Sequence, residues 1–235
     1  MNFMSAPQQY IGKVAEHVEL NSKYHVLTIE LVKPGTIEFL AGQYISIDIG
    51  DGARRSYSIA SAPAKNYAID LCVDVDGNGK GMTYLKNLKP GDEIKFLAPL
   101  GRFILEQEKK LLFVATGCGI TPLKSMIFDL LEEKKDQREI WLYWGLRYAE
   151  EMFWEEEFRE LTEFYPNFKF RLVLSKPPEK WPLASGHVTD EIKMMQLGSE
   201  WGVYICGNAG VLEDTKKIMT EKDVQEKQVH FEKFS

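Results

Sequence analysis

Along the first hundred residues, apolar and polar positions alternate in short runs that end at turn signals. The clearest runs are Tyr24–Val32 and Tyr44–Ile49, each typical of a strand with one buried face. Pro, Gly and Asp cluster between such runs, as at Lys33–Gly35 and Lys89–Asp92, and predict turns. Further short strands are expected at Tyr57–Ala60, Ala68–Val75 and Glu93–Leu97. Short strands with regular turns predict a small antiparallel β-barrel.

The pattern changes between Phe103 and Lys109. Leu111–Ala115 is a continuous apolar run, as in a strand buried on both faces of a parallel sheet. Similar strands are expected at Ile140–Trp144, Phe168–Leu174 and Val203–Cys206. Apolar residues at helical spacing follow the first two strands: Leu123, Met126, Ile127, Leu130 and Leu131, then Trp154, Phe158, Leu161 and Tyr165. Alternating strands and helices predict an α/β domain with a parallel sheet, so we expect domains at 1–105 and 106–235.

Composition narrows the class of protein. Of 235 residues, 44% are hydrophobic and 27% are charged, which is ordinary for a globular chain. The net charge of −6 argues against a broad basic face for nucleic acid. No apolar run approaches the roughly 18 residues that span a bilayer. The start also lacks the basic and apolar regions of a secretory signal. We therefore expect a cytoplasmic protein with neither membrane nor nucleic acid as partner.

The cysteines and histidines do not predict a metal site. The 3 cysteines and 4 histidines are widely spaced, whereas an iron–sulfur cluster commonly takes four thiolates and structural zinc sites use closely spaced pairs. The segment Asp74–Gly79 resembles the start of a calcium-binding loop, but Leu85 stands where the bidentate Glu is needed. We interpret that segment as a hairpin turn, since Asp-Gly and Asn-Gly favour one, and we expect no metal.

A glycine-containing loop follows the first buried strand. Ala115–Pro122 contains two glycines that allow close approach of a ligand to the backbone. Pro122 suits the first helical position, and a helix start favours an anion such as phosphate. The loop does not match the standard dinucleotide fingerprint. A tight strand-to-helix turn without a ligand is the alternative.

Three further segments carry candidate chemistry. In Arg54–Ser61, alternation directs Arg55, Tyr57 and Ile59 to one side, where Arg and Tyr suit a phosphate and a flat ring; an exposed edge strand is the alternative. Gly79–Leu85 is interpreted as a loop forming an anion nest. Tyr204–Asn208 places a Cys-Gly at the end of a strand, where open α/β sheets bind ligands, although a buried Cys also serves as plain packing.

The order of these segments resembles the ferredoxin–NADP reductase family, and the resemblance covers Ile11 to Phe234. It implies that the strand containing Arg55, Ser56, Tyr57 and Ser58 binds flavin. Arg55 would pair with the pyrophosphate, Tyr57 would pack on the isoalloxazine, and Ser58 would hydrogen-bond near N5. The same resemblance places Gly81, Met82 and Thr83 on a second flavin-phosphate loop.

The resemblance also implies a pyridine-nucleotide site. Its phosphate loop would comprise Gly117, Gly119, Thr121 and Pro122, with Cys118 where many relatives carry Thr. Cys206 and Gly207 match the family's Cys-Gly near the nicotinamide. Glu232 and Phe234 have the spacing of the family's terminal carboxylate and aromatic residue, although Ser235 follows here. The candidate catalytic residues are therefore Ser58, Cys206 and Glu232.

The resemblance implies a flavoprotein reductase that moves hydride from NADPH or NADH to FAD, with FMN as the alternative flavin. Electrons would pass on to a separate ferredoxin, flavodoxin or oxygenase component. Reduction of free flavin as a dissociating substrate, and a non-catalytic nucleotide-binding regulatory subunit, remain alternatives. Ser175-Lys176 occupies the position that often contacts the 2′-phosphate of NADPH, and Arg147 ends the previous strand. A solvated surface Lys is an equal interpretation, so the choice of nucleotide stays open.

Overall fold

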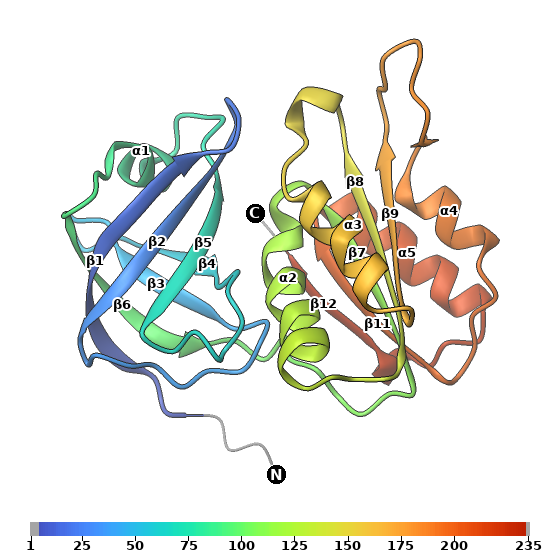
Figure 1. Ribbon diagram of the computed structural model, residues 1–235, viewed down its shortest axis with the longest axis horizontal. Helices are drawn as coiled ribbons and strands as arrows, with labels where there is room; N and C mark the ends of the chain where they lie inside the picture. The colour runs from blue at the N-terminus through green and yellow to red at the C-terminus, as the bar shows by residue number, and fades with distance from the viewer. Residues whose placement is uncertain (1–4, 234–235) are drawn as a thin grey trace. The chain divides into compact units, whose positions relative to one another are not determined.

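The computed structural model describes residues 5–233 and separates into two compact units (Figure 1). The first unit comprises the chain up to Leu105 together with 124–134, and the second comprises 106–123 together with 135–235. The elements up to Leu105 are β1 (Gln8–Glu19), β2 (Tyr24–Lys33), β3 (Tyr44–Asp48), β4 (Arg54–Ser58), β5 (Ala68–Asp74), α1 (Lys80–Asn87) and β6 (Glu93–Leu100).

The first unit is built on an antiparallel sheet in the order β4-β3-β6-β1-β2-β5. The outermost strands, β4 and β5, approach each other beyond Ser58, where Ile59 bridges Leu71 and the Ala60 amide donates to the Asp70 carbonyl at 2.7 Å. This contact curls the sheet into the predicted barrel. Its interior is filled by fully buried side chains such as Leu27, Ile29, Ile45, Ile47 and Phe96, which lie on the apolar positions of the alternating pattern.

Local structure differs from the sequence prediction at two places in the barrel. The strand expected from Tyr57 begins at Arg54 and ends at Ser58. The hairpin turn expected at Asp74–Gly79 is wrong, because this segment joins β5 to helix α1, with Gly79 as the N-cap. The loop expected over Gly79–Leu85 is therefore mostly the first turns of α1, which the buried Leu85 anchors to the barrel core.

From Glu106 onward the chain alternates strands and helices as predicted. The elements are β7 (Lys110–Thr116), α2 (Ile120–Phe128), β8 (Glu139–Leu146), α3 (Glu155–Phe164), β9 (Phe168–Leu174), β10 (Ala184–Ser185), α4 (Val188–Met194), β11 (Trp201–Gly207), α5 (Ala209–Glu221) and β12 (Val229–Lys233). The sheet order is β10-β9-β8-β7-β11-β12, and every pairing is parallel. The predicted α/β sheet is confirmed, and its two edge strands, β10 and β12, are additions that the sequence pattern did not indicate.

Helices cover both faces of this parallel sheet, with α3 in front of it and α4 and α5 behind it in Figure 1. On one face, Trp144 packs edge-on against Phe158 of α3, with ring centroids 6.0 Å apart. On the other face, Val203 and Ile205 of β11 share a buried cluster with Val211 of α5. Burial on both faces explains the continuous apolar runs in the sequence. No helix within residues 5–233 is long and apolar enough to cross a membrane.

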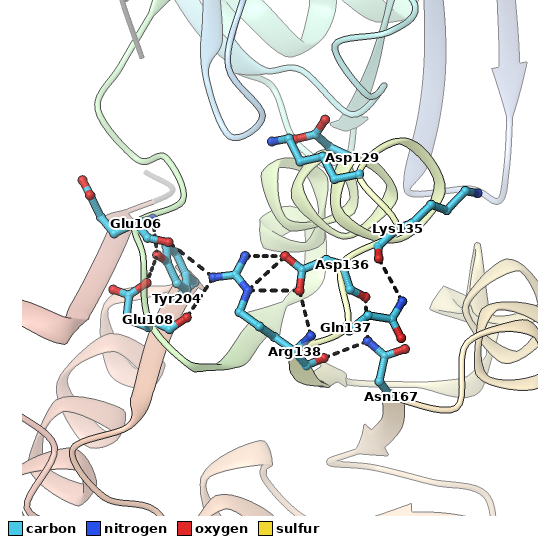
Figure 2. A network of polar contacts seen from close by, with 10 residues as sticks. Glu106, Glu108, Asp129, Lys135, Asp136, Gln137, Arg138, Asn167 and Tyr204 are labelled. Atoms are coloured by element: carbon cyan, nitrogen blue, oxygen red, sulfur yellow. Dashed lines mark hydrogen bonds and ion pairs between the residues drawn. The ribbon is translucent and has the colours of Figure 1, made fainter. Parts of the chain in front are cut away.

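A polar network fixes the segment that enters β7 (Figure 2). Glu108 accepts a hydrogen bond from Tyr204, at 2.9 Å, and pairs with His230, at 2.7 Å. The Arg138 guanidinium donates to the Glu108 carbonyl and holds both carboxylate oxygens of Asp136. Burial raises the pKa of the Glu108 carboxyl, but the hydrogen bonds from His230 and Tyr204 outweigh it and leave that pKa below its ordinary value. The network ties the start of β7 to β11 and β12, whose opposite ends carry the predicted site.

Candidate functional site

Strand β4 carries the first group of predicted site residues. Arg55 and Tyr57 pair with Ile47 and Ile45 of β3, and directly paired residues share a face of the sheet. Tyr57 is half-buried against the barrel core, whereas Arg55 is exposed. Burial raises the pKa of the Tyr57 phenol to about 12, against a smaller lowering by Arg55. A neutral ring beside an exposed guanidinium is suited to a flat ring linked to a phosphate.

The two serines of β4 differ in exposure. Ser56 is exposed, whereas Ser58 is 5% exposed at the end of the strand. A buried hydroxyl is held in a more defined position than an exposed one, because the surrounding atoms limit its rotamers. Ser58 is therefore more restricted in its orientation than Ser56.

Helix α1 meets β4 at a single glycine. A Cβ added at Gly81 would lie 2.6 Å from the Tyr57 hydroxyl oxygen and 2.8 Å from Arg55 Cγ, so a larger residue at this position would displace these side chains or the helix. The amides of the first helical turn have no partner within the helix and favour an anion. Two segments separated in the sequence thus form one cradle with amides and a guanidinium, which fits a flavin pyrophosphate. In the same turn, Met82 is half-buried and Thr83 is exposed.

The loop after β7 forms the second cradle. Gly117–Gly119 is a 3₁₀ turn, and Gly117 has a left-handed φ of +53° that favours glycine. The Gly117 carbonyl accepts a hydrogen bond from the Trp144 indole at 3.0 Å. The hydroxyl of Thr121 is fully buried and donates to the Cys118 carbonyl at 2.7 Å, so Thr121 holds the loop in shape. Pro122 is the third residue of α2, not the first as predicted, because the helix begins at Ile120.

Two glycines bring this loop against the end of β11. A Cβ at Gly119 would lie 2.1 Å from the Cys206 carbonyl oxygen, and one at Gly207 would lie 2.1 Å from Thr116 Oγ1. Real Cβ atoms essentially never come so close. Glycine is required at 119, where the obstacle is backbone, whereas a Cβ at 207 would force the Thr116 side chain to move. The predicted phosphate loop and the predicted Cys-Gly therefore form one continuous surface at the carboxyl ends of β7 and β11, where open α/β sheets bind ligands.

Cys206 and Glu232 are neighbours across β11 and β12, since they pair in the parallel register. Cys206 is fully buried and Glu232 is half-buried. Burial raises the pKa of the Cys206 thiol well above its ordinary value, and Glu232 and Cys118 add to the shift. Cys206 is therefore a protonated thiol at neutral pH, suited to packing or donating rather than to nucleophilic attack. The third residue predicted near here, Phe234, lies outside the described residues.

Cations also gather at the ends of β8 and β9. The Arg147 guanidinium and the Lys176 ammonium lie 5.3 Å and 5.9 Å from the Tyr148 ring centroid. The Lys176 amide donates to the Arg147 carbonyl at 2.9 Å, which holds the two segments together. Tyr148 was not among the predicted site residues, although an aromatic residue beside Arg147 was a readable signal.

Asn208 is a second residue near the site that sequence reasoning missed. It is the N-cap of α5, where its side chain accepts from the Val211 amide at 3.1 Å, and its own amide donates to Thr116 Oγ1. An Asn directly before a helical pattern is a recognised start signal, so the sequence contained this information. Among the described residues, no group of three or more His, Cys, Asp or Glu is placed to hold a metal ion.

Comparisons with known proteins match the two cradles to two different nucleotide-binding domains. Residues 12–104 match the family model described as an oxidoreductase FAD-binding domain, and residues 113–217 match the oxidoreductase NAD-binding domain. The reductase component DmpP of phenol 2-monooxygenase from Pseudomonas sp. is 31% identical over 99% of this chain and 68% of its own length. The chain belongs to the ferredoxin reductase-like family of flavin- and pyridine-nucleotide-binding oxidoreductases.

Other relatives and solved structures are similar over nearly the whole chain. The phenol hydroxylase P5 protein of Acinetobacter pittii is 29% identical over 97% of this chain and 66% of its own length. The Amycolatopsis cytochrome P450 reductase GcoB superposes with a TM-score of 0.88 at 26% identity, over 97% of this chain and 70% of that one. The Plasmodium falciparum ferredoxin-NADP⁺ reductase shares the fold, with a TM-score of 0.79, 22% identity and 96% coverage of both chains. The chain thus spans about two thirds of the length of several relatives.

Proposed function

We propose that this chain takes a hydride from NADPH or NADH onto bound FAD and passes the electrons to a separate acceptor. The observation that carries the proposal is the pair of glycine cradles. Gly81 admits α1 against Arg55 and Tyr57, and Gly119 admits the phosphate loop against Cys206. The first cradle lies in the segment that matches the FAD-binding domain, and the second lies in the segment that matches the NAD-binding domain.

In the first cradle, the first-turn amides of α1 and the Arg55 guanidinium would hold the pyrophosphate of FAD. The Tyr57 ring would lie against the isoalloxazine. The buried Ser58 hydroxyl would hydrogen-bond near N5, and this bond would set the ring's position. When bound, FAD supplies the redox chemistry, accepting a hydride and releasing electrons one at a time.

In the second cradle, the amides of Gly117–Gly119 would bind the pyridine-nucleotide phosphates. Thr121 and Trp144 would keep the loop in shape through the hydrogen bonds described above. The Cys206 thiol, with Gly207, would pack beside the nicotinamide, and Glu232 would flank Cys206 from β12. Orientation is the main contribution of these residues, because aligned reactants lower the barrier without acid or base chemistry.

The acceptor is proposed as a ferredoxin, a flavodoxin or an oxygenase component. Relatives with such roles support it: one is the electron transfer component of anthranilate 1,2-dioxygenase from Acinetobacter baylyi, which is 29% identical over 95% of this chain. Within the 235 residues, all three cysteines are buried thiols, too few for a four-thiolate iron–sulfur cluster. Thiol cysteines also support a reducing compartment, and we infer a cytoplasmic location.

Flavin occupancy tests this proposal against reduction of free flavin. We expect the protein to leave gel filtration yellow, with about one flavin per chain, and to oxidise NADPH or NADH with ferricyanide as acceptor. Chromatography of the flavin released by heat distinguishes FAD from FMN. A colourless protein that reduces added flavin would establish the free-flavin alternative, since its flavin would dissociate after each turnover. A protein without ferricyanide turnover would instead be a regulatory subunit.

A further inference from the structure

Helix α2 contains a buried hydroxyl that makes a hydrogen bond outside the helix. Ser125 is fully buried, and its hydroxyl donates to the backbone carbonyl of Ser61 at 2.7 Å. Both residues belong to the first unit, which includes 124–134. Ser61 is also buried, and a buried carbonyl that loses its donor is costly. The bond therefore ties the backbone just beyond β4 to a residue that is 64 positions further along the chain.

The backbone that leaves β4 is hydrogen-bonded at each residue. In the segment 59–61, the first amide donates to the Gln43 carbonyl at 3.0 Å and the second donates to the Asp70 carbonyl at 2.7 Å. The Ser61 hydroxyl accepts from the Asp70 amide at 3.1 Å. Ser125 adds the bond to the carbonyl at the end of the segment. The short stretch of chain directly after the candidate flavin strand is thus held from the barrel and from α2.

Apolar packing also holds α2 against the first unit. Met126, the residue after Ser125, is fully buried. A Cβ added at Gly42 would lie 2.3 Å from Met126 Cε, so the Met126 side chain fills the space beside Gly42. This contact does not involve the Ser125 hydroxyl. We therefore expect the helix to stay in place when the hydroxyl is removed, and the Ser61 carbonyl to be the group that is affected.

We propose that Ser125 is a positioning residue for flavin reduction, which acts by fixing the backbone that holds the Ser58 hydroxyl. The inference rests on the proposed function, in which that hydroxyl hydrogen-bonds near N5 of bound FAD. Removal of the Ser125 hydroxyl takes the donor from the buried Ser61 carbonyl, and the segment 59–61 relaxes. Ser58 directly precedes this segment, and a misplacement of about 1 Å at a reacting centre slows a reaction strongly.

A double-mutant cycle tests whether Ser125 acts through Ser58. Stopped flow measures flavin reduction by saturating NADPH or NADH in the FAD-loaded wild type, Ser125→Ala, Ser58→Ala and the double variant. We expect Ser125→Ala to slow reduction about fivefold, as loss of one hydrogen bond does. In the Ser58→Ala background the same change should slow it less than about twofold, because the hydroxyl that Ser125 positions is already absent. The FAD dissociation constant should change less than the reduction rate.

Thr215→Val is the matched control, because Thr215 is also a fully buried residue inside a helix. Within residues 5–233 its hydroxyl has no hydrogen-bond partner, so removing it deprives no carbonyl of a donor. We expect this variant to reduce flavin at the wild-type rate. A slowing as large as that of Ser125→Ala would show that loss of any buried helical hydroxyl has this effect, and would contradict a specific role for Ser125.

The outcomes separate this inference from the proposed function. An unchanged rate in Ser125→Ala, or an equal slowing with and without the Ser58 hydroxyl, would overturn the positioning role and leave the reductase assignment intact. A FAD-loaded wild type that neither nucleotide reduces would overturn both. Should Ser125→Ala fail to fold, Ser125→Cys takes its place in the cycle under the same criteria, since the thiol is a weaker donor of similar size.

Discussion

Ser58 is a polar residue that is only 5% exposed at the end of β4. In the proposed mechanism its hydroxyl orients the flavin ring and contributes little to holding the cofactor. We expect Ser58→Ala to slow flavin reduction by NADPH by about tenfold or more, as loss of one well-placed hydrogen bond does. The FAD dissociation constant should change much less. Stopped-flow measurement of an unchanged reduction rate would remove Ser58 from the mechanism.

Gly81 provides a second test at the level of a single residue, with a control two positions away. A Cβ at Gly81 would meet Tyr57 and Arg55 within 2.8 Å, whereas one at Gly79 would have nothing nearer than 3.8 Å. We expect Gly81→Ala to raise the FAD dissociation constant about tenfold or more, since overpacking costs about 1–3 kcal/mol. Gly79→Ala should bind FAD like the wild type. Equal affinities for the two variants would show that α1 does not form the cradle.

Two cations, Arg147 and Lys176, lie at the Tyr148 ring just beyond the ends of β8 and β9. This arrangement favours a bound phosphate, as in NADPH. We expect the double variant Arg147→Ala/Lys176→Ala to lower kcat/KM for NADPH about tenfold while leaving NADH nearly unchanged. Lys180→Ala, in the exposed loop beyond Lys176, is the control. A parallel fall for both nucleotides would contradict a phosphate-specific role.

The helices and strands also show how much of the fold the sequence could predict. The buried parallel strands were predictable because a continuous apolar run such as Leu111–Ala115 is too short to span a bilayer and is typical of a strand covered on both faces. Helix α1 was missed because its first turns contain glycine at Gly81 and follow Gly79, and glycine normally disfavours helix. In this case a Cβ at residue 81 would crowd Tyr57 and Arg55, a long-range constraint that no local pattern reveals. Strand β12 was missed because it is a short, polar edge strand.

Among the site residues, the sequence located the motifs but not how they pack. The resemblance placed Cys206 beside the nicotinamide, and the register of β11 with β12 then brought Glu232 next to it. The close approach of Gly119 to the Cys206 carbonyl could not be foreseen, because it joins two loops that are distant in the sequence and no local pattern reveals it.

At the scale of the whole molecule, the chain consists of two units, each with its own core and its own nucleotide-binding family model. The family relationship fixes FAD and a pyridine nucleotide as the two ligands. The proposed function adds the transfer of a hydride from the pyridine nucleotide to FAD. It requires that the two cradles described above work on the same turnover.

Anaerobic mixing of the FAD-loaded protein with NADPH, and separately with NADH, measures this hydride transfer directly. We predict that at least one nucleotide bleaches the visible flavin absorbance in a single turnover, with one equivalent of reduced nucleotide consumed per flavin. A protein that holds FAD fully, yet keeps its flavin absorbance with an excess of both nucleotides, would contradict the proposed hydride transfer.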